Sequence, residues 1–256
     1  MLFVVLRLAL IVPLVGLFLL PLFVRMVIRR PGDPLQGVRR SAWFCRVFLR
    51  ILNIHIHAGR TDLRAVFGQA GLKVFNHLSW IDPIIINCGL PVRFVTSVEM
   101  RDTPLLGDVC TGAGCVFVER RSNRAIAEEA QALTESIRTS SIVAFPESTS
   151  SDGTGVLPFK PAFFQSAIAA GMPIQPMCLR YLAVDGVFLN RKSGDLVHWY
   201  GDMTFLPHVL RLVQTRRIDV VIVTLPMLEV SGRDRKSLAK EAHDRIERVY
   251  RRAMRL

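Results

Sequence analysis

The apolar positions divide the chain into one long hydrophobic segment and a larger region of short alternating runs. Residues 2–24 contain a single charge, Arg7, and residues 8–24 contain none. That length reaches the lower limit for a helix that crosses a bilayer. Five arginines follow at close spacing: Arg25, Arg29, Arg30, Arg39 and Arg40. The pattern predicts a membrane segment over residues 1–28, with the rest of the chain on the cytoplasmic side. Two prolines leave a re-entrant segment open as an alternative.

Residues 29–60 read as a basic linker followed by an amphipathic helix. Apolar residues recur there at helical spacing: Trp43, Phe44, Val47, Phe48, Ile51 and Leu52. Ser41 is expected to cap this helix, since serine is favoured at helix N-termini. Its apolar face suits either an interfacial membrane helix or a helix packed on the core, and both interpretations stay open.

From residue 72 onwards, short apolar runs alternate with helical patterns, as in α/β proteins. The expected strands are Leu72–Phe75, Arg93–Ser97, Cys115–Glu119, Ile142–Phe145, Ile174–Tyr181 and Asp219–Thr224. Helices are expected after Ser122 or Asn123, over Pro161–Ala170 and from about Asp234. The sequence therefore predicts a single mostly parallel or mixed sheet with flanking helices, forming one domain over residues 61–256.

Composition narrows the choice of partner. The formal net charge of +12 attracts polyanions, but 50% of the residues are hydrophobic and the mean hydropathy is +0.33. These values favour membrane lipids over nucleic acid. The five cysteines form no CxxC pair, so neither a disulfide framework nor a metal site is expected, and a reducing compartment is the simplest location.

The most informative stretch, Asn76 to Asp82, directly follows a predicted strand. A histidine at the carboxyl end of a strand faces the crevice where α/β proteins bind ligands. Asp82, five residues after His77, can accept a hydrogen bond from one ring nitrogen and leave the other as a general base. A histidine and an aspartate at this spacing are common, so an ordinary surface histidine remains the alternative for this motif alone.

Two further polar elements follow predicted strands. Arg120 and Arg121 end an apolar strand, where guanidinium groups suit a phosphate or carboxylate, although a solvated strand end gives the same pattern. The run from Phe145 to Ser151 gives a tight loop with exposed amides, or simply a polar turn. A parallel sheet would bring these strand ends and His77 around one pocket.

At this point the sequence resembles the lysophospholipid acyltransferases, a family that includes 1-acylglycerol-3-phosphate acyltransferases. Four ordered motifs carry the resemblance: Asn76, His77 and Asp82; Phe117 to Arg120; Phe145, Pro146, Glu147 and Thr149; and Pro173 to Pro176. Ser148 replaces the usual glycine and Ser150 an expected arginine, which puts an acceptor phosphate in doubt. Residues 150–153 and 199–203 resemble the branch of lyso-ornithine lipid acyltransferases.

The resemblance implies catalysis by His77 and Asp82, with direct acyl transfer from a thioester to a lysolipid hydroxyl. Arg120 and Arg121 would bind the acceptor headgroup, and Glu147 would hold Arg120, an acceptor hydroxyl or an ornithine ammonium. Ser148 and Thr149 would complete the substrate site, with Asn76, Pro146 and Pro176 as supporting motif residues.

The expected partners are membrane lipids, a lysolipid acceptor, and acyl carrier protein or coenzyme A as the thioester. No cofactor is expected, and the enzyme would work at the cytoplasmic face of the inner membrane. A noncatalytic lipid-binding protein and a lysolipid or thioester hydrolase on the same fold are the alternatives.

Overall fold

The computed structural model describes residues 2–28, 34–59, 61–88, 92–103, 106–118, 123–189 and 193–252. Within these residues, eight strands form one mixed sheet in the order β1-β8-β6-β2-β5-β3-β4, with β7 paired to β6. The strands are β1 (Ile54–His57), β2 (Gly71–Phe75), β3 (Arg93–Ser97), β4 (Val116–Val118), β5 (Ser141–Ala144), β6 (Ile174–Val184), β7 (Val187–Phe188) and β8 (Ile218–Thr224). All neighbouring pairs are parallel except β6 with β8 and β6 with β7.

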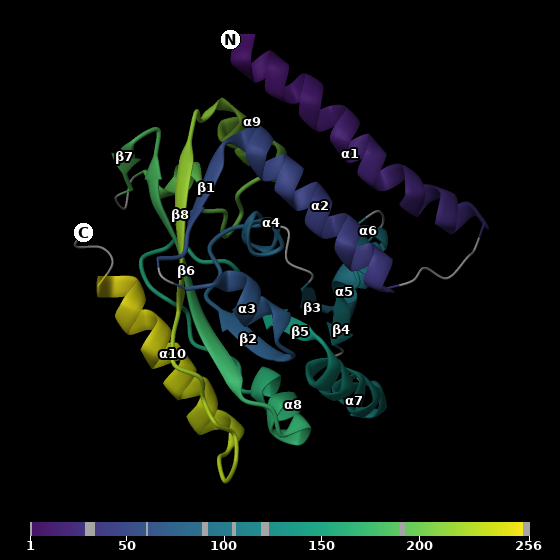
Figure 1. Ribbon diagram of the computed structural model, residues 1–256, viewed down its shortest axis with the longest axis vertical. Coiled ribbons are helices and arrows are strands. Elements are labelled where there is room, and N and C mark those ends of the chain that lie inside the picture. Colours follow the sequence, from purple (N-terminus) through teal and green to yellow (C-terminus); the bar gives the residue numbers. More distant parts are fainter. Residues whose placement is uncertain are drawn as a thin grey trace.

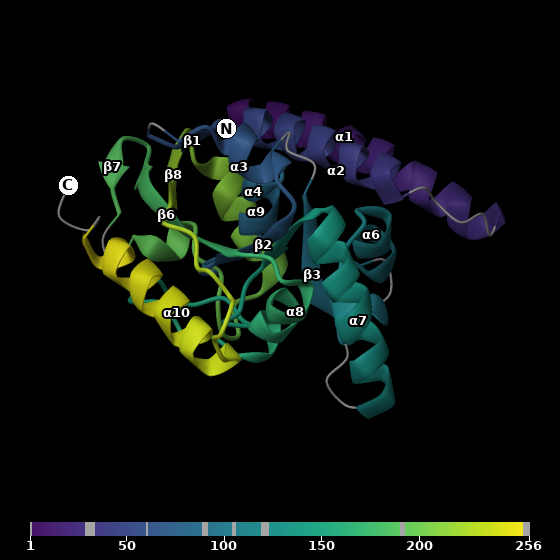
Figure 2. The ribbon, with the colours of Figure 1, turned by 60° about the horizontal axis from the view of Figure 1, so that its bottom comes forward.

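Helices cover both faces of the sheet (Figures 1 and 2). They are α1 (Leu2–Ile28), α2 (Pro34–Leu52), α3 (Leu63–Gly68), α4 (Asp82–Ile86), α5 (Val98–Arg101), α6 (Leu106–Gly112), α7 (Asn123–Thr139), α8 (Ala162–Ala170), α9 (Phe205–Gln214) and α10 (Arg235–Arg252). Figure 2 shows α7, α8 and α10 on one side and the α1–α2 pair on the other. The predicted α/β class, single mixed sheet and apolar N-terminal helix are confirmed.

The central strands are buried on both faces, which explains why the sequence shows them as mostly apolar runs, with Lys73 the one charged residue of β2. All five residues of β2 are buried, and so are all four of β5. All six predicted strands occur, with ends shifted by three residues at most. Strand β1, which was not predicted, lies before the expected boundary at residue 61 and pairs with β8. Its alternating histidines hid it from a hydropathy pattern.

The prediction that Ser41 caps a helix is wrong. Helix α2 begins at Pro34, so Ser41 lies in its interior. The Ser41 hydroxyl donates to the carbonyl of Val38 at 2.9 Å and accepts from the Asn87 side chain at 3.0 Å. Proline at the first position of a helix is as strong a start signal as a cap residue, because its missing N–H has no partner there anyway.

Helix α2 uses its apolar face in two ways. Phe48 and Leu52 are buried in the core, whereas Trp43 is 47% exposed. Phe44 packs against Phe18 of α1, with ring centroids 4.5 Å apart. The core-packing interpretation of this helix therefore holds for Phe48 and Leu52, and Trp43 remains available to a membrane surface.

Helix α1 lies along the domain rather than projecting from it (Figure 1). The Arg7 guanidinium donates to the carbonyls of Leu52 at 3.2 Å, Val213 at 3.0 Å and Thr215. These carbonyls lie at the ends of α2 and α9, where helices leave acceptors unsatisfied. Over residues 2–20, most of the outer surface of α1 is apolar and exposed, and by length and composition this part of the helix is a candidate membrane span.

Candidate active site

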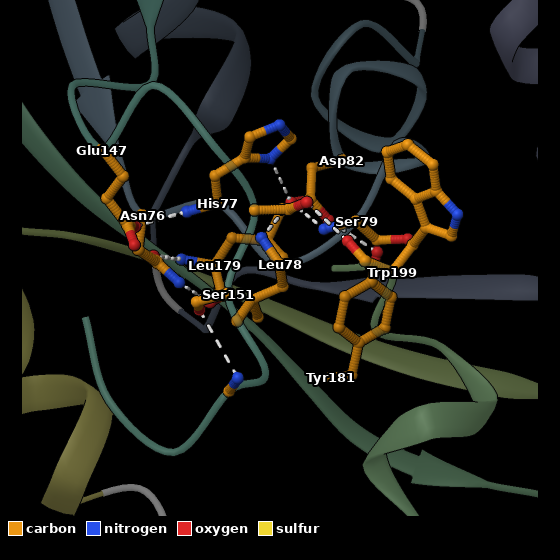
Figure 3. A network of polar contacts seen from close by, with 12 residues as sticks. Asn76, His77, Leu78, Ser79, Asp82, Glu147, Ser151, Leu179, Tyr181 and Trp199 are labelled. Atoms are coloured by element: carbon orange, nitrogen blue, oxygen red, sulfur yellow. Dashed lines mark hydrogen bonds and ion pairs between the residues drawn. The ribbon is translucent and has the colours of Figure 1, made fainter. Parts of the chain in front are cut away.

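The centre of the site is the loop that follows β2, which turns back on itself around one carboxylate (Figure 3). Asp82 is the first residue of α4 and is fully buried. Its Oδ2 accepts from His77 Nδ1 at 2.8 Å and from the backbone N–H groups of Leu78 at 2.6 Å and Ser79 at 2.9 Å. These three donors keep the loop closed and compensate for burial of the charge.

The bond to Asp82 sets the chemistry of His77. With Nδ1–H donating to the carboxylate, Nε2 carries the free lone pair and acts as the basic atom. The imidazole stacks on Phe145, with ring centroids 4.1 Å apart and planes at 19°. Its side chain is 19% exposed, so a substrate can reach it. Within the described part of the chain, no hydrogen bond occupies Nε2. The predicted pairing of His77 with Asp82 is thus present in the geometry.

Tyr181 adds a fourth donor to Asp82, which the sequence did not predict. Its hydroxyl, on β6, donates to Asp82 Oδ1 at 2.6 Å. Burial and the adjacent carboxylate raise the pKa of Tyr181 well above its ordinary value, so the phenol stays protonated and remains a donor. Both oxygens of Asp82 are therefore hydrogen-bonded, and the Asp82 side chain itself is closed to water.

Asn76 holds the end of β2 against β6. Its side-chain amide donates to the carbonyl of Leu179 at 2.9 Å, and its side-chain oxygen accepts from the Leu179 N–H at 2.8 Å. With these two hydrogen bonds, the Asn76 side chain extends the pairing of β2 with β6 by one residue. The supporting role expected for Asn76 has this physical basis: it fixes where the backbone leaves the sheet before His77.

Glu147 supports the same loop from beneath. Its Oε1 accepts from the His77 N–H at 2.7 Å, and its Oε2 accepts from the Leu157 N–H at 2.8 Å. The side chain is 4% exposed. Burial raises the pKa of Glu147 to about 8, although the two N–H donors oppose that rise. The two backbone bonds make Glu147 a residue that positions His77, while the substrate role expected for it stays a prediction, since Arg120 lies outside the described residues.

The other residues of this loop differ in accessibility. Pro146 is buried, and its carbonyl accepts from the Lys160 N–H at 2.9 Å. Ser148 takes a left-handed conformation with φ of 62°, which explains why glycine suits the position. Thr149 is exposed, as a residue that contacts substrate must be. Pro176 is buried on β6 opposite Val74, so it supports the sheet rather than contacting substrate.

Two predicted headgroup ligands, Arg120 and Arg121, lie outside the described residues. The strand that leads to them, β4, is two strands away from the β5 end that carries the Glu147 loop, with β3 between them. All three strands are parallel, so their carboxyl ends share one edge of the sheet. The ends of β2, β5 and β4 therefore lie at the same edge of the sheet, and their gathering around one pocket stays a prediction.

Helix α10 fixes the segment that follows the Glu147 loop. Glu247 accepts from the Val156 N–H at 2.8 Å, and the Tyr250 hydroxyl donates to the carbonyl of Gly153 at 2.7 Å. Ser151 returns to the catalytic loop, where its N–H donates to the carbonyl of His77 at 2.9 Å. The active-site loop is thus fixed on one side by the sheet and on the other by α10.

Comparisons with known proteins show the family to which a chain with this sheet and this loop belongs. Residues 55–180 match the family model described as Acyltransferase. The chain is 31% identical over 225 residues to a lyso-ornithine lipid O-acyltransferase of Brucella abortus, covering 84% of this chain and 83% of that protein. It is also 31% identical over 220 residues to a 1-acyl-sn-glycerol-3-phosphate acyltransferase of Neisseria meningitidis, covering 85% and 83%.

The fold has a solved counterpart. The crystal structure of the 1-acyl-sn-glycerophosphate acyltransferase PlsC from Thermotoga maritima aligns with a TM-score of 0.58. The alignment covers 93% of this chain and 87% of that one, at 17% sequence identity. The chain belongs to the acyltransferase family, and it is an acyltransferase of the lysophospholipid and lyso-ornithine lipid type.

Proposed function

We propose that this enzyme transfers a fatty acyl group from an acyl thioester directly to the free hydroxyl of a lysolipid, with His77 as the general base. The observation that carries the proposal is the 2.8 Å bond from His77 Nδ1 to Asp82, in a His77 side chain that is 19% exposed. A base that is fixed in one tautomer and open to a substrate is the arrangement that activates a hydroxyl.

In the proposed step, Nε2 of His77 takes the proton of the acceptor hydroxyl as its oxygen attacks the thioester carbonyl. Asp82 stabilises the imidazolium that forms. The tetrahedral intermediate then collapses, the carbon–sulfur bond breaks, and the thiolate takes the proton back from His77. No enzyme nucleophile is needed, because the thioester is already activated. Ser79, the one serine between His77 and Asp82, is fully buried and lies in no nucleophile elbow.

The acceptor is proposed to be lysophosphatidic acid or lyso-ornithine lipid, since relatives of both names match most of the chain. Both carry a negatively charged group near the reacting hydroxyl. Arg120, with Arg121 assisting, is the proposed ligand for that charge. The two acceptors differ in that lyso-ornithine lipid also carries an ammonium, so parallel assays separate them.

The proposed donor is acyl carrier protein or coenzyme A carrying the acyl chain. Helix α10 contains many basic residues, with Arg248, Arg251 and Arg252 exposed near its end. Such a surface suits an acidic carrier protein or the phosphates of coenzyme A. Comparing the two donors with one acceptor decides between them.

The proposed location is the cytoplasmic face of the inner membrane, with α1 lying in the membrane plane. Arg7 binds the domain near one end of α1, and Phe18 packs on Phe44 of α2 farther along. A helix held to a folded domain at both places cannot cross the bilayer while that domain stays outside. Its exposed leucines and valines would face acyl chains.

The test supplies purified enzyme in mixed micelles with labelled acyl carrier protein or acyl coenzyme A. Lysophosphatidic acid and lyso-ornithine lipid are offered in separate reactions. The proposal expects labelled diacyl product from at least one pair, and little free fatty acid when the acceptor is omitted. Acceptor-independent release of fatty acid would indicate a hydrolase instead. Replacing Arg120 with alanine should mainly raise the KM for the charged acceptor.

A further inference from the structure

Helix α9 presents an apolar face to the outside. Leu206 and Leu210, four residues apart on one side of the helix, are 65% and 40% exposed, and Phe205 at its N-terminal end is 54% exposed. His208 and Leu212, on the side that continues from Phe205, are buried. Large apolar side chains exposed together in this way are informative because soluble surfaces rarely group them. This helix was not predicted from the sequence.

Helix α9 lies next to helix α1. The two helices are in contact, and Arg7 of α1 donates to the carbonyls of Val213 and Thr215 at the C-terminal end of α9. The same part of α1 exposes Leu2, Val5 and Leu6 by more than half. Figure 1 places α9 beside the N-terminal half of α1. Exposed apolar side chains therefore occur both on the candidate membrane helix and on the adjacent helix of the catalytic domain.

Cations border this face. Arg211 on α9 and Arg216 just after it are exposed, and within the described ranges neither guanidinium bonds a carboxylate. Arg217, the next residue, is neutralised locally by Asp219. Apolar side chains with arginines at the margin match a membrane surface, where the arginines meet anionic headgroups.

Helix α9 also contacts the catalytic loop. Trp80 lies between His77 and Asp82 in sequence, and its indole N–H donates to His208 Nδ1 at 3.0 Å. The Trp80 ring packs edge-on against Phe205, with centroids 5.0 Å apart. A lipid beside Phe205 would therefore be one aromatic ring away from the loop that holds the catalytic base.

We propose that α9 is a second membrane-contacting element, which inserts Phe205, Leu206 and Leu210 at the boundary between headgroups and acyl chains. This surface would let a lysolipid pass from the bilayer to His77 without entering water. Only the passage of a lysolipid to His77 rests on the proposed function. Contact with lipid itself can be measured without any activity.

The direct test places a nitroxide spin label at Leu206→Cys and compares its collisions with oxygen and with a polar nickel chelate. The full-length protein is reconstituted on vesicles of phosphatidylethanolamine and phosphatidylglycerol. Oxygen concentrates in the bilayer and the chelate in water. Met227→Cys is the matched control, since Met227 is also apolar and 51% exposed but lies after β8. The signal from label on the native cysteines is measured with wild-type protein and subtracted.

The proposal expects the label at residue 206 to favour oxygen over the chelate, and the label at residue 227 to favour the chelate. Equal chelate access at both positions would overturn it. Low access to both reagents at residue 206 would also overturn it, since a protein surface, such as a second copy of the chain, would then cover α9.

A functional test separates docking from catalysis. Leu206→Asp combined with Leu210→Asp should lower the ratio of the transfer rate on vesicle-borne lysolipid to that on a short-chain monomeric lysolipid, by about tenfold. Met227→Asp should leave this ratio as in wild type. An unchanged ratio in the double variant would contradict the proposal. Absence of transfer in wild type with either acceptor would count against the proposed function, while the spin-label result would still decide the docking.

Discussion

The Tyr181 hydroxyl donates to Asp82 Oδ1 at 2.6 Å, on the side of the carboxylate opposite to His77. Ninety-nine residues separate the two partners in sequence. The bond exists because β6 runs parallel to β2, with Phe75 opposite Met177, so the residues beyond that pair lie beside the catalytic loop. Tyr181 is therefore a positioning residue: it acts on the base through Asp82.

Tyr181→Phe is expected to lower the free energy of unfolding by about 1.5–3 kcal/mol, because a buried carboxylate oxygen loses its donor. The carboxylate that holds His77 would also lose one of its four donors, so the pH profile of kcat/KM should differ from that of wild type. Thermal unfolding and the pH profile measure the two effects.

Tyr250→Phe is the matched control for that variant. Tyr250 is also a buried tyrosine, but its hydroxyl donates to the neutral carbonyl of Gly153. The Tyr250→Phe variant should have a free energy of unfolding lower than that of wild type by about 0.5–1.5 kcal/mol, and the same pH profile of kcat/KM. Identical pH profiles for wild type and Tyr181→Phe would argue against a positioning role for Tyr181.

Glu147 should make stability depend on pH. Burial raises its pKa from an ordinary 4.5 to about 8, so the folded protein binds a proton that the unfolded chain has lost between these values. The contribution of Glu147 is therefore present at low pH and falls as pH rises from 4.5 to 8, by at most about 1.4 kcal/mol per pH unit.

Unfolding of wild type and Glu147→Gln in the same detergent at pH 5, 6.5 and 8 measures this dependence. The variant should be less stable at pH 5 by about 1–3 kcal/mol, because one backbone N–H loses its acceptor. The difference should narrow towards pH 8 as wild type loses stability. A difference that stays constant or widens with pH would show that Glu147 is ionised in the folded protein throughout.

Ser148 holds a conformation that costs a non-glycine residue about 1–2 kcal/mol. Ser148→Gly should unfold at the same temperature as wild type or higher, and Ser148→Val should be less stable by about 1–2 kcal/mol. Thr149→Val, at the exposed neighbouring position, is the control and should change little. Equal stability of the valine and glycine variants at position 148 would rule out backbone strain as the reason for glycine there.

Much of the fold could be predicted because the central strands are buried on both faces. Burial makes Ile142–Phe145 a continuous apolar run and Leu72–Phe75 an apolar run interrupted only by Lys73, and each is followed by a polar motif at the sheet edge. Strand β1 and helix α9 were not predicted from the sequence. His55 and His57 break the apolar pattern of β1, and α9 carries apolar side chains on its outer as well as its inner face.

The site could be predicted only where its contacts are local in sequence. His77 and Asp82 lie within one loop, so their spacing was enough to suggest the bond. Tyr181 reaches Asp82 through strand pairing, which spacing does not reveal. The two backbone partners of Glu147 were not predicted, because sequence shows a carboxylate without showing which N–H groups surround it.

The central claim is that His77 is the base, and the most direct measurement is acyl transfer by His77→Ala beside wild type. His57→Ala is the control, since His57 is a half-exposed histidine on the edge strand β1. The account predicts a loss of about 10²–10⁴-fold for His77→Ala, with normal folding and membrane binding, and near wild-type transfer for His57→Ala. Transfer by His77→Ala close to that of wild type would contradict it.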